Sequence, residues 1–176
     1  MPTVRASRTI AAPAAELWEL VCDPYHLPRW WPRVERVEDV ADGAFTQVMR
    51  TRAGKTVRAD YDLLRADAQS GVVVWAQRLE GTPFAGVLSH SETELRVTPS
   101  GGQAGGYPRS DGRSGSEVTI EMRQELSGRA MQPLVAGPGA TAGSRRRIPS
   151  LGGWMLRRAA ARTIAEALDG LEQISA

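Results

Sequence analysis

Apolar and polar residues alternate along several segments before Leu126, and this period of two predicts strands with one buried face. Between residues 56 and 64, for example, Val57, Ala59 and Tyr61 alternate with charged side chains. Turn residues separate most of these segments at the spacing of hairpins, so we expect an antiparallel sheet whose second face is solvated. The predicted strands span residues 4–11, 34–40, 45–52, 56–64, 72–79, 86–97 and 117–126.

Two segments follow the helical period instead. A short helix is predicted over residues 14–22, where Pro13 suits the first turn. Asp23-Pro24 ends it, because a residue before proline avoids the helical region. A long helix is predicted over residues 150–174, with polar residues opposite an apolar stripe. The stripe, flanked by Trp154, comprises Ala160, Ala161, Ile164, Ala167, Leu168 and Leu171.

A strand, two short helical pieces, six strands and a long terminal helix follow one another in the order of the helix-grip fold. In this order the chain resembles the SRPBCC superfamily, whose members include START-like, birch-pollen-allergen-like and polyketide cyclase/dehydratase proteins. The resemblance is carried by the first strand with residues 12–18 (APAAELW), by residues 27–32 (LPRWWP), and by residues 156–174, which contain EALDGL. It covers nearly the whole chain, except residues 99–116 and part of 128–147.

The resemblance implies an α+β domain in which a curved antiparallel sheet of about six or seven strands wraps around the C-terminal helix. Two short helices are expected after the first strand, and a cavity between the sheet and the long helix. Members of the superfamily use this cavity for lipids, sterols, aromatic polyketides or plant hormones. They share no universal catalytic motif, so the resemblance transfers no catalytic residue.

We expect a single domain over residues 1–176, in which the Gly/Ser-rich tract 99–116 is a flexible hairpin insertion. A second mobile connection is expected over residues 128–147, which are rich in glycine and proline.

Composition and charge exclude some classes of function but do not indicate which one the protein has. The net charge is only +2 and gives no reason to infer a nucleic-acid partner, so we expect none. The single cysteine, Cys22, excludes an intrachain disulfide and a cysteine-based metal cage. No motif for a nucleotide, a dinucleotide or catalytic zinc is present, so we expect no cofactor. Without a signal pattern or a bilayer-long apolar run, we expect a cytoplasmic protein with no stable membrane insertion. The oligomeric state stays open.

Polar residues in the inward rows of the predicted sheet also indicate a cavity. The row that runs from Val87 to Val97 includes Ser89, Ser91 and Thr93, and Gln124 interrupts the inward row of the last strand. Buried polar groups need partners, so these side chains suggest water or a polar ligand group. Two alternatives remain: the rows are assigned one residue out of register, or the polar groups pair with each other.

Arg157 is the anomalous charge, because it projects from the apolar stripe of the long helix. It can bind a ligand carboxylate or an enolate, pair with Asp60 or Asp62, or extend to solvent at the helix end. Trp30 and Trp31 either wall the pocket or close one end of the core. Phe84, between glycines, is either a lid over the cavity or an exposed residue of an ordinary turn.

The predicted lining of the cavity combines these residues with the neighbouring aromatic and helical positions. It comprises Trp18, Trp30, Trp31, Tyr61, Trp75, Gln77, Phe84, Ser89, Ser91, Gln124, Trp154, Arg157 and Ala161.

The leading hypothesis is therefore the binding or transport of a hydrophobic or aromatic small molecule, lipid-like or polyketide-like. A cyclase- or dehydratase-like enzyme is the first alternative, with Arg157, Tyr61, Asp60 and His26 as candidate reacting groups. A partner-binding module related to stress or chaperone proteins is the second. His90 and Glu92 are expected to form a surface pair rather than a metal site.

Overall fold

The structure is a computed structural model, and the residues that it describes are 3–51, 53–100, 115–128 and 151–175. Most of the predicted insertion 99–116, and nearly all of the predicted connection 128–147, lie outside these residues.

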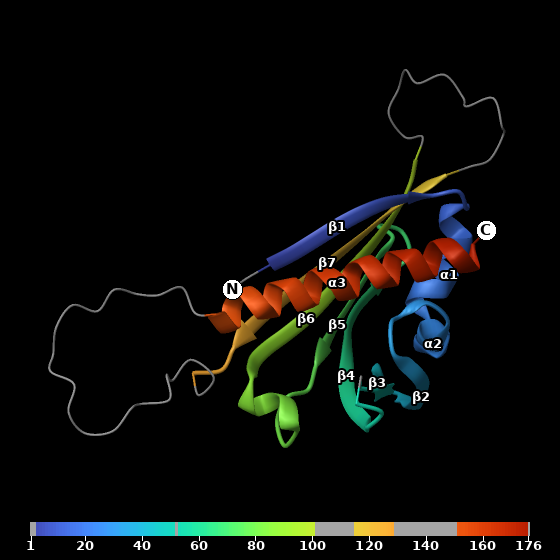
Figure 1. The fold of residues 1–176 in the computed structure, drawn as a ribbon. Coiled ribbons are helices and arrows are strands. Elements are labelled where there is room, and N and C mark those ends of the chain that lie inside the picture. Colours follow the sequence, from blue (N-terminus) through green and yellow to red (C-terminus); the bar gives the residue numbers. More distant parts are fainter. Residues whose placement is uncertain (1–2, 52, 101–114, 129–150, 176) are drawn as a thin grey trace, which may run out of the picture.

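Seven strands of the described chain form one antiparallel sheet in the order β1-β7-β6-β5-β4-β3-β2. The strands are β1 (Thr3–Ile10), β2 (Val34–Ala41), β3 (Ala44–Arg50), β4 (Thr56–Asp67), β5 (Val72–Gln77), β6 (Leu88–Pro99) and β7 (Ser116–Leu126). The helices are α1 (Ala14–Cys22), η1 (Pro24–His26), α2 (Leu27–Trp30), η2 (Pro83–Gly86) and α3 (Leu151–Ile174). Figure 1 shows α3 lying along the sheet, with α1 and α2 beside its C-terminal end. The predicted α+β helix-grip architecture is confirmed.

The segment after β1 folds as its sequence predicts. Leu17 and Val21, one helical turn apart, are the buried residues of α1. The Asp23 carboxylate accepts a hydrogen bond from the backbone N–H of Tyr25 at 2.9 Å, which caps the short turn η1. Leu27 and Trp30 are the buried residues of α2. These packed side chains hold the chain where it turns into β2 and the sheet.

The buried face of α3 follows the predicted stripe except at Ala161. Among the helix residues whose side chains are described, burial begins at Ala160, and Ile164, Leu168 and Leu171 continue the face toward the C-terminus. The prediction for Ala161 is wrong: this residue is exposed. It lies about a quarter of a turn around the helix from Ala160, where the sheet no longer covers the surface.

Gly170 allows α3 to touch the backbone of α2. A β-carbon at this position would lie 2.4 Å from the Trp30 carbonyl oxygen and 2.9 Å from the Trp30 α-carbon. Only a residue without a side chain permits this approach. The contact fixes the position of Trp30 and therefore of Trp31, which follows it.

The predicted inward row of β6 is correct from Ser91 onward and wrong before it. Ser91 and Thr93 are buried, but Ser89 is exposed, and Leu88 is buried in its place. The cause is a register irregularity between Leu88 and His90 in the pairing with β7. An extra residue in one strand reverses the faces that follow it.

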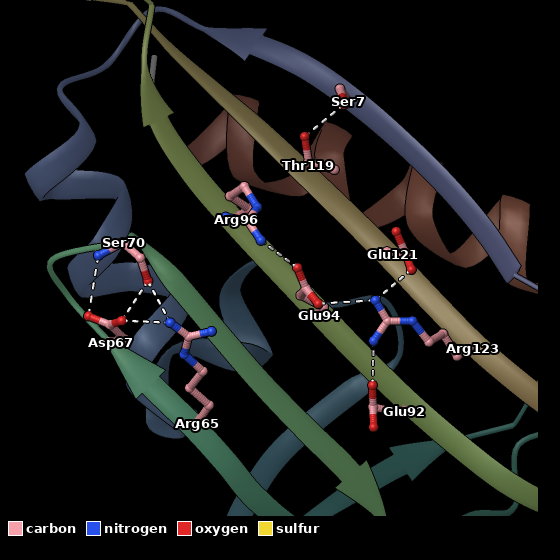
Figure 2. Close-up of polar contacts among 10 residues, drawn as sticks. All are labelled: Ser7, Arg65, Asp67, Ser70, Glu92, Glu94, Arg96, Thr119, Glu121 and Arg123. Atoms are coloured by element: carbon pink, nitrogen blue, oxygen red, sulfur yellow. Dashed lines mark hydrogen bonds and ion pairs between the residues drawn. The ribbon is translucent and has the colours of Figure 1, made fainter.

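The outer face of β6 and β7 carries a cluster of charges around Arg123 (Figure 2). The Arg123 guanidinium lies 2.5 Å from Glu92, 3.1 Å from Glu94 and 2.7 Å from Glu121. Burial raises the pKa of Glu94, but hydrogen bonds from Arg96 and Arg123 outweigh it and lower the pKa overall. Arg123 therefore offsets the repulsion among three neighbouring carboxylates.

Arg123→Met should lower the free energy of unfolding by about 2 kcal/mol at pH 7, because it leaves three half-buried carboxylates without their shared cation. A carboxylate with a lowered pKa stabilises the fold above its unfolded pKa and loses this contribution as pH falls. The difference from wild type should therefore shrink in urea titrations at pH 3. Arg65→Met, which removes an exposed partner of Asp67, is the control and should lower the free energy of unfolding far less. If Arg123→Met lowered the free energy of unfolding equally at pH 7 and at pH 3, the prediction would be contradicted.

Candidate functional site

A partly open pocket of about 340 Å³ lies on the inner face of the sheet. Five strands, the segment after α2, the turn η2 and one residue of α3 contribute to its walls. The lining residues are Trp31, Pro32, Arg33, Met49, Arg50, Thr51, Val57, Tyr61, Trp75, Gln77, Phe84, Leu88, Ser91, Thr93, Met122, Gln124 and Thr163.

Aromatic rings form one wall of this pocket. The Trp31 and Trp75 rings meet edge to face, with centroids 5.7 Å apart. Phe45 stacks on Tyr61 at 5.3 Å and meets Trp75 edge to face at 6.3 Å. The β3–β4 pairing places Phe45 directly opposite Tyr61, so the sheet register creates this stack. The interlocked rings make a rigid apolar surface for a flat or hydrophobic ligand.

A polar row lies beside the aromatic wall, since Thr93 pairs with Trp75 and Gln77 pairs with Tyr61 in the sheet. The Gln124 side-chain amide donates a hydrogen bond to the Ser91 hydroxyl at 3.4 Å. Thr93 is buried one step further along β6, and Gln77 lines the same pocket. The polar groups thus pair with each other in part, as one alternative expected. The remaining hydrogen-bonding capacity faces the pocket and suits polar atoms of a ligand.

Tyr61 combines a ring in the aromatic wall with a hydroxyl at the pocket. Burial raises the pKa of this hydroxyl well above its ordinary value of about 10, so it carries its proton at neutral pH. Among the described residues it has no hydrogen-bond partner. A protonated hydroxyl without a partner is a donor available to a ligand oxygen.

The raised pKa of Tyr61 predicts a loss of stability in alkali. Above about pH 10 the unfolded chain releases the Tyr61 proton while the folded chain retains it. The free energy of unfolding should therefore fall by up to about 1.4 kcal/mol per pH unit in urea titrations from pH 9.5 to 11. Tyr61→Phe should remove most of this fall, whereas Tyr25→Phe, which changes an exposed tyrosine, should not. Parallel curves for wild type and Tyr61→Phe would refute the assignment.

Charged and hydroxyl groups mark the rim of the pocket, where Arg33, Arg50 and Thr51 line it beside Thr163 of α3. The Arg50 guanidinium lies 2.5 Å from the Glu35 carboxylate, which neutralises it.

Phe84 also lines the pocket, on the turn η2. The Thr82 hydroxyl caps this turn by accepting the backbone N–H of Phe84 at 3.2 Å. The Phe84 side chain is therefore part of the lining, and not an exposed residue of a plain hairpin.

Seven of the thirteen residues predicted from the sequence border this pocket. They are Trp31, Tyr61, Trp75, Gln77, Phe84, Ser91 and Gln124.

Three further predicted residues belong to the core or to the outer surface. Trp18 is partly buried and packs against the core. Trp30 is buried and donates its indole N–H to the Leu20 carbonyl at 3.1 Å, so it closes the core rather than lining the pocket. Ser89 lies on the outer face because of the irregularity in β6.

Three others lie on the first half of α3, before the buried face begins. Trp154 is 60% exposed, and Arg157 and Ala161 are exposed as well. They border a shallow groove against the start of β1, and none of them lines the pocket. They were expected in the lining because helical periodicity places them near the stripe, whereas these three side chains remain exposed.

The structure excludes one of the three alternatives for Arg157, the ion pair with Asp60 or Asp62. Asp60 accepts a hydrogen bond from the Thr46 hydroxyl at 2.6 Å, and Asp62 is bound to Arg78. Neither pairs with Arg157. The residue is exposed, as the solvent alternative expects, and the ligand-binding alternative stays a hypothesis.

The candidate reacting groups do not converge on one point. Of the four candidates, only Tyr61 lines the pocket. Asp60 and Arg157 are not among the lining residues, and the His26 ring nitrogen Nδ1 lies 3.2 Å from the Glu19 carbonyl.

In the described ranges, no group of three or more His, Cys, Asp or Glu side chains is placed to hold a metal ion. The His90 nitrogen Nε2 lies 4.0 Å from the Glu92 carboxylate. This nitrogen is buried and has no hydrogen-bond partner among the described residues, so the expected surface pair is only partly exposed. No described helix is long and apolar enough to cross a membrane.

Several lining residues were missed from the sequence. Met49, Val57 and Met122 lie in predicted strands on the inward side, so the period of two contained the signal for them. Thr93 stood in the predicted inward row but was not named as lining. Arg33 and Thr163 could not be predicted from a sequence pattern. Arg33 lies in a loop and Thr163 on the flank of a helix, and only the tertiary structure brings these segments together at the pocket.

The comparison with protein families gives one match over nearly the whole chain. The family model described as "Polyketide cyclase / dehydrase and lipid transport" matches residues 1–175. No curated protein shows significant sequence similarity to the chain.

Solved structures share the fold at low sequence identity. An aromatase/cyclase named Zhui from Streptomyces sp. R1128 is 22% identical, with a TM-score of 0.60 over 99% of this chain and 93% of the other. A START superfamily protein from Mycobacterium smegmatis is 13% identical, with a TM-score of 0.64 over 98% and 96%. The di-domain aromatase/cyclase BexL from the BE-7585A biosynthetic pathway is 18% identical, with a TM-score of 0.65 over 98% and 46%. At these identities the likeness establishes the fold alone.

Proposed function

The chain belongs to the polyketide cyclase/dehydrase and lipid transport family, and from this premise we propose that it binds a hydrophobic or aromatic small molecule in the pocket beside α3. The observation that carries the proposal is the aromatic wall of Trp31, Trp75 and Tyr61 around about 340 Å³ of space. Ligand pockets have volumes in this range, with apolar walls and a few polar groups that orient the ligand. Ser91, Gln124 and Tyr61 supply those groups here.

The second candidate function is an enzyme of the cyclase or dehydratase type that uses the same pocket. Tyr61 favours it, because its hydroxyl retains a proton and has no partner among the described residues. A hydroxyl of this kind can donate a proton or a hydrogen bond to a ligand carbonyl as negative charge develops on the oxygen. Against this, no second acid or base among the candidates reaches the pocket. Binding is therefore the function that the site supports better.

Uptake of the neutral fluorescent probe N-phenyl-1-naphthylamine tests the proposal. We expect one probe molecule per chain and an increase in fluorescence, because the probe leaves water for the aromatic wall. Native mass spectrometry after mild purification tests for a retained ligand in parallel. A folded protein that neither binds the probe nor retains a small molecule would overturn the proposal.

A further inference from the structure

The pocket continues over its rim into a groove along the first half of α3. This groove, about 570 Å³ in volume, shares Arg33 and Thr163 with the pocket. Its other lining residues are Trp154, Met155, Arg158, Ala159 and Arg162. We call it the arginine groove.

Positive charge predominates in the arginine groove. Arg33, Arg158 and Arg162 line it, and the acidic partner of two of them is Glu166. Glu166 lies 2.5 Å from Arg162 but 3.9 Å from Arg33, so its charge is largely committed to Arg162. Three cations against one carboxylate leave a surplus of two positive charges.

Arg158 keeps its charge available. Its guanidinium lies over the Trp154 ring, 5.3 Å from the centroid, which orients it without neutralising it. Among the described residues, no carboxylate lies within ion-pair distance of Arg158. The segment 129–150, which precedes the helix in sequence, contains no Asp or Glu.

Arg33 stands at the junction of pocket and groove in an unusual conformation. Its φ angle is +66°, in the left-handed region that bulky residues rarely adopt. Such conformations cost energy and occur preferentially where a site needs them. The backbone here aims a cation at the rim, where Thr163 adds a hydroxyl.

We propose that the arginine groove binds an oxyanion, a phosphate or a carboxylate, carried by the ligand whose apolar part lies in the pocket. The proposal rests on the proposed function and specifies its ligand class as an amphipathic anion. Guanidinium groups match the geometry of both oxyanions and bind them with charge-assisted hydrogen bonds. The shared rim places the anion directly outside the aromatic wall.

Two probes with the same aromatic skeleton separate the groove from the pocket. The first, 8-anilinonaphthalene-1-sulfonate, carries an oxyanion, and the second, N-phenyl-1-naphthylamine, lacks it. We expect Arg158→Gln to weaken the anionic probe about fivefold to tenfold and to leave the neutral probe unchanged. Arg33 also lines the pocket, so Arg33→Gln should weaken the anionic probe more than the neutral one. Inorganic phosphate should compete with the anionic probe only.

Arg157→Gln is the matched control, because it removes the same charge from the same helix and Arg157 does not line the arginine groove. Arg158 lines both grooves, so Arg33 is the cation that distinguishes the arginine groove from the other one. Arg157→Gln should leave both affinities within twofold of wild type. Equal effects of the Arg157, Arg158 and Arg33 variants would overturn the proposal, since they would indicate general attraction to a positive surface. If neither probe binds the wild-type protein, both the proposed function and the groove proposal are overturned. If only the neutral probe binds, the groove proposal is overturned and the proposed function stands.

Sedimentation with vesicles identifies the source of the oxyanion. Vesicles of phosphatidylcholine with phosphatidylserine should pull the protein down in an Arg158-dependent way if the oxyanion is a lipid headgroup. If it belongs to a free ligand, the protein should stay in solution while phosphate competition persists. Vesicle binding that is equal in wild type and in the Arg33 and Arg158 variants would contradict a role of the groove.

Discussion

Gly170→Ala should lower the free energy of unfolding by about 3 kcal/mol, although alanine favours helices over glycine by about 1 kcal/mol. The added β-carbon would lie 2.4 Å from the Trp30 carbonyl oxygen, and backbone atoms cannot rotate away as a side chain can. Either α3 shifts away from α2, or the helix bends locally. Both changes reduce the packing around the buried Trp30. Urea denaturation followed by circular dichroism measures the loss.

The control for this prediction is Gly152→Ala in the same helix. A β-carbon at Gly152 would lie 3.5 Å from a methyl group of Leu126, which is ordinary van der Waals contact. Its stability should equal that of wild type or exceed it by up to about 0.5 kcal/mol. If Gly170→Ala were as stable as Gly152→Ala, the close approach of α3 to Trp30 would be wrong.

Ser91→Leu should weaken the binding of N-phenyl-1-naphthylamine at least tenfold. Leucine replaces the hydroxyl with a branched group that occupies pocket space. It also removes the acceptor of the Gln124 amide hydrogen bond and leaves that amide unpaired. Both effects oppose ligand entry more than they oppose folding, because the new side chain extends into an open space. Fluorescence titration measures the affinity, and urea denaturation verifies that the variant is folded.

Ser89→Leu makes the same chemical change two residues earlier in the chain, on the exposed face of β6. It should leave probe affinity within twofold of wild type. The pair therefore tests both the pocket and the strand irregularity that separates the two serines. A regular strand would place them on one face, and Ser89→Leu would then weaken binding as Ser91→Leu does. Wild-type affinity in Ser91→Leu would refute the proposed pocket.

The arrangement of the inner sheet face could be predicted because strand periodicity is local. Tyr61, Trp75 and Gln124 follow from alternation along single strands, and the structure brings them to one pocket. The prediction was wrong for Ser89, which was expected to face inward. A strand irregularity depends on pairing with β7 and leaves no clear mark in the alternating pattern. Phe45 was expected in a strand, but its stack on Tyr61 depends on the register between β3 and β4.

The amino-acid sequence by itself determined the element order, the inward face of most strands and the helical period of the last segment, since each depends on neighbouring residues along the chain. The tertiary structure decided how far the sheet covers α3. Arg157 lies on the apolar side by helical angle, yet it is exposed, because the buried residues of the helix, among those whose side chains are described, run from Ala160 to Leu171. It also decided that Arg33, Thr163 and Arg158 share one groove. Contacts between segments distant in sequence carry no local period, so only packing could reveal them.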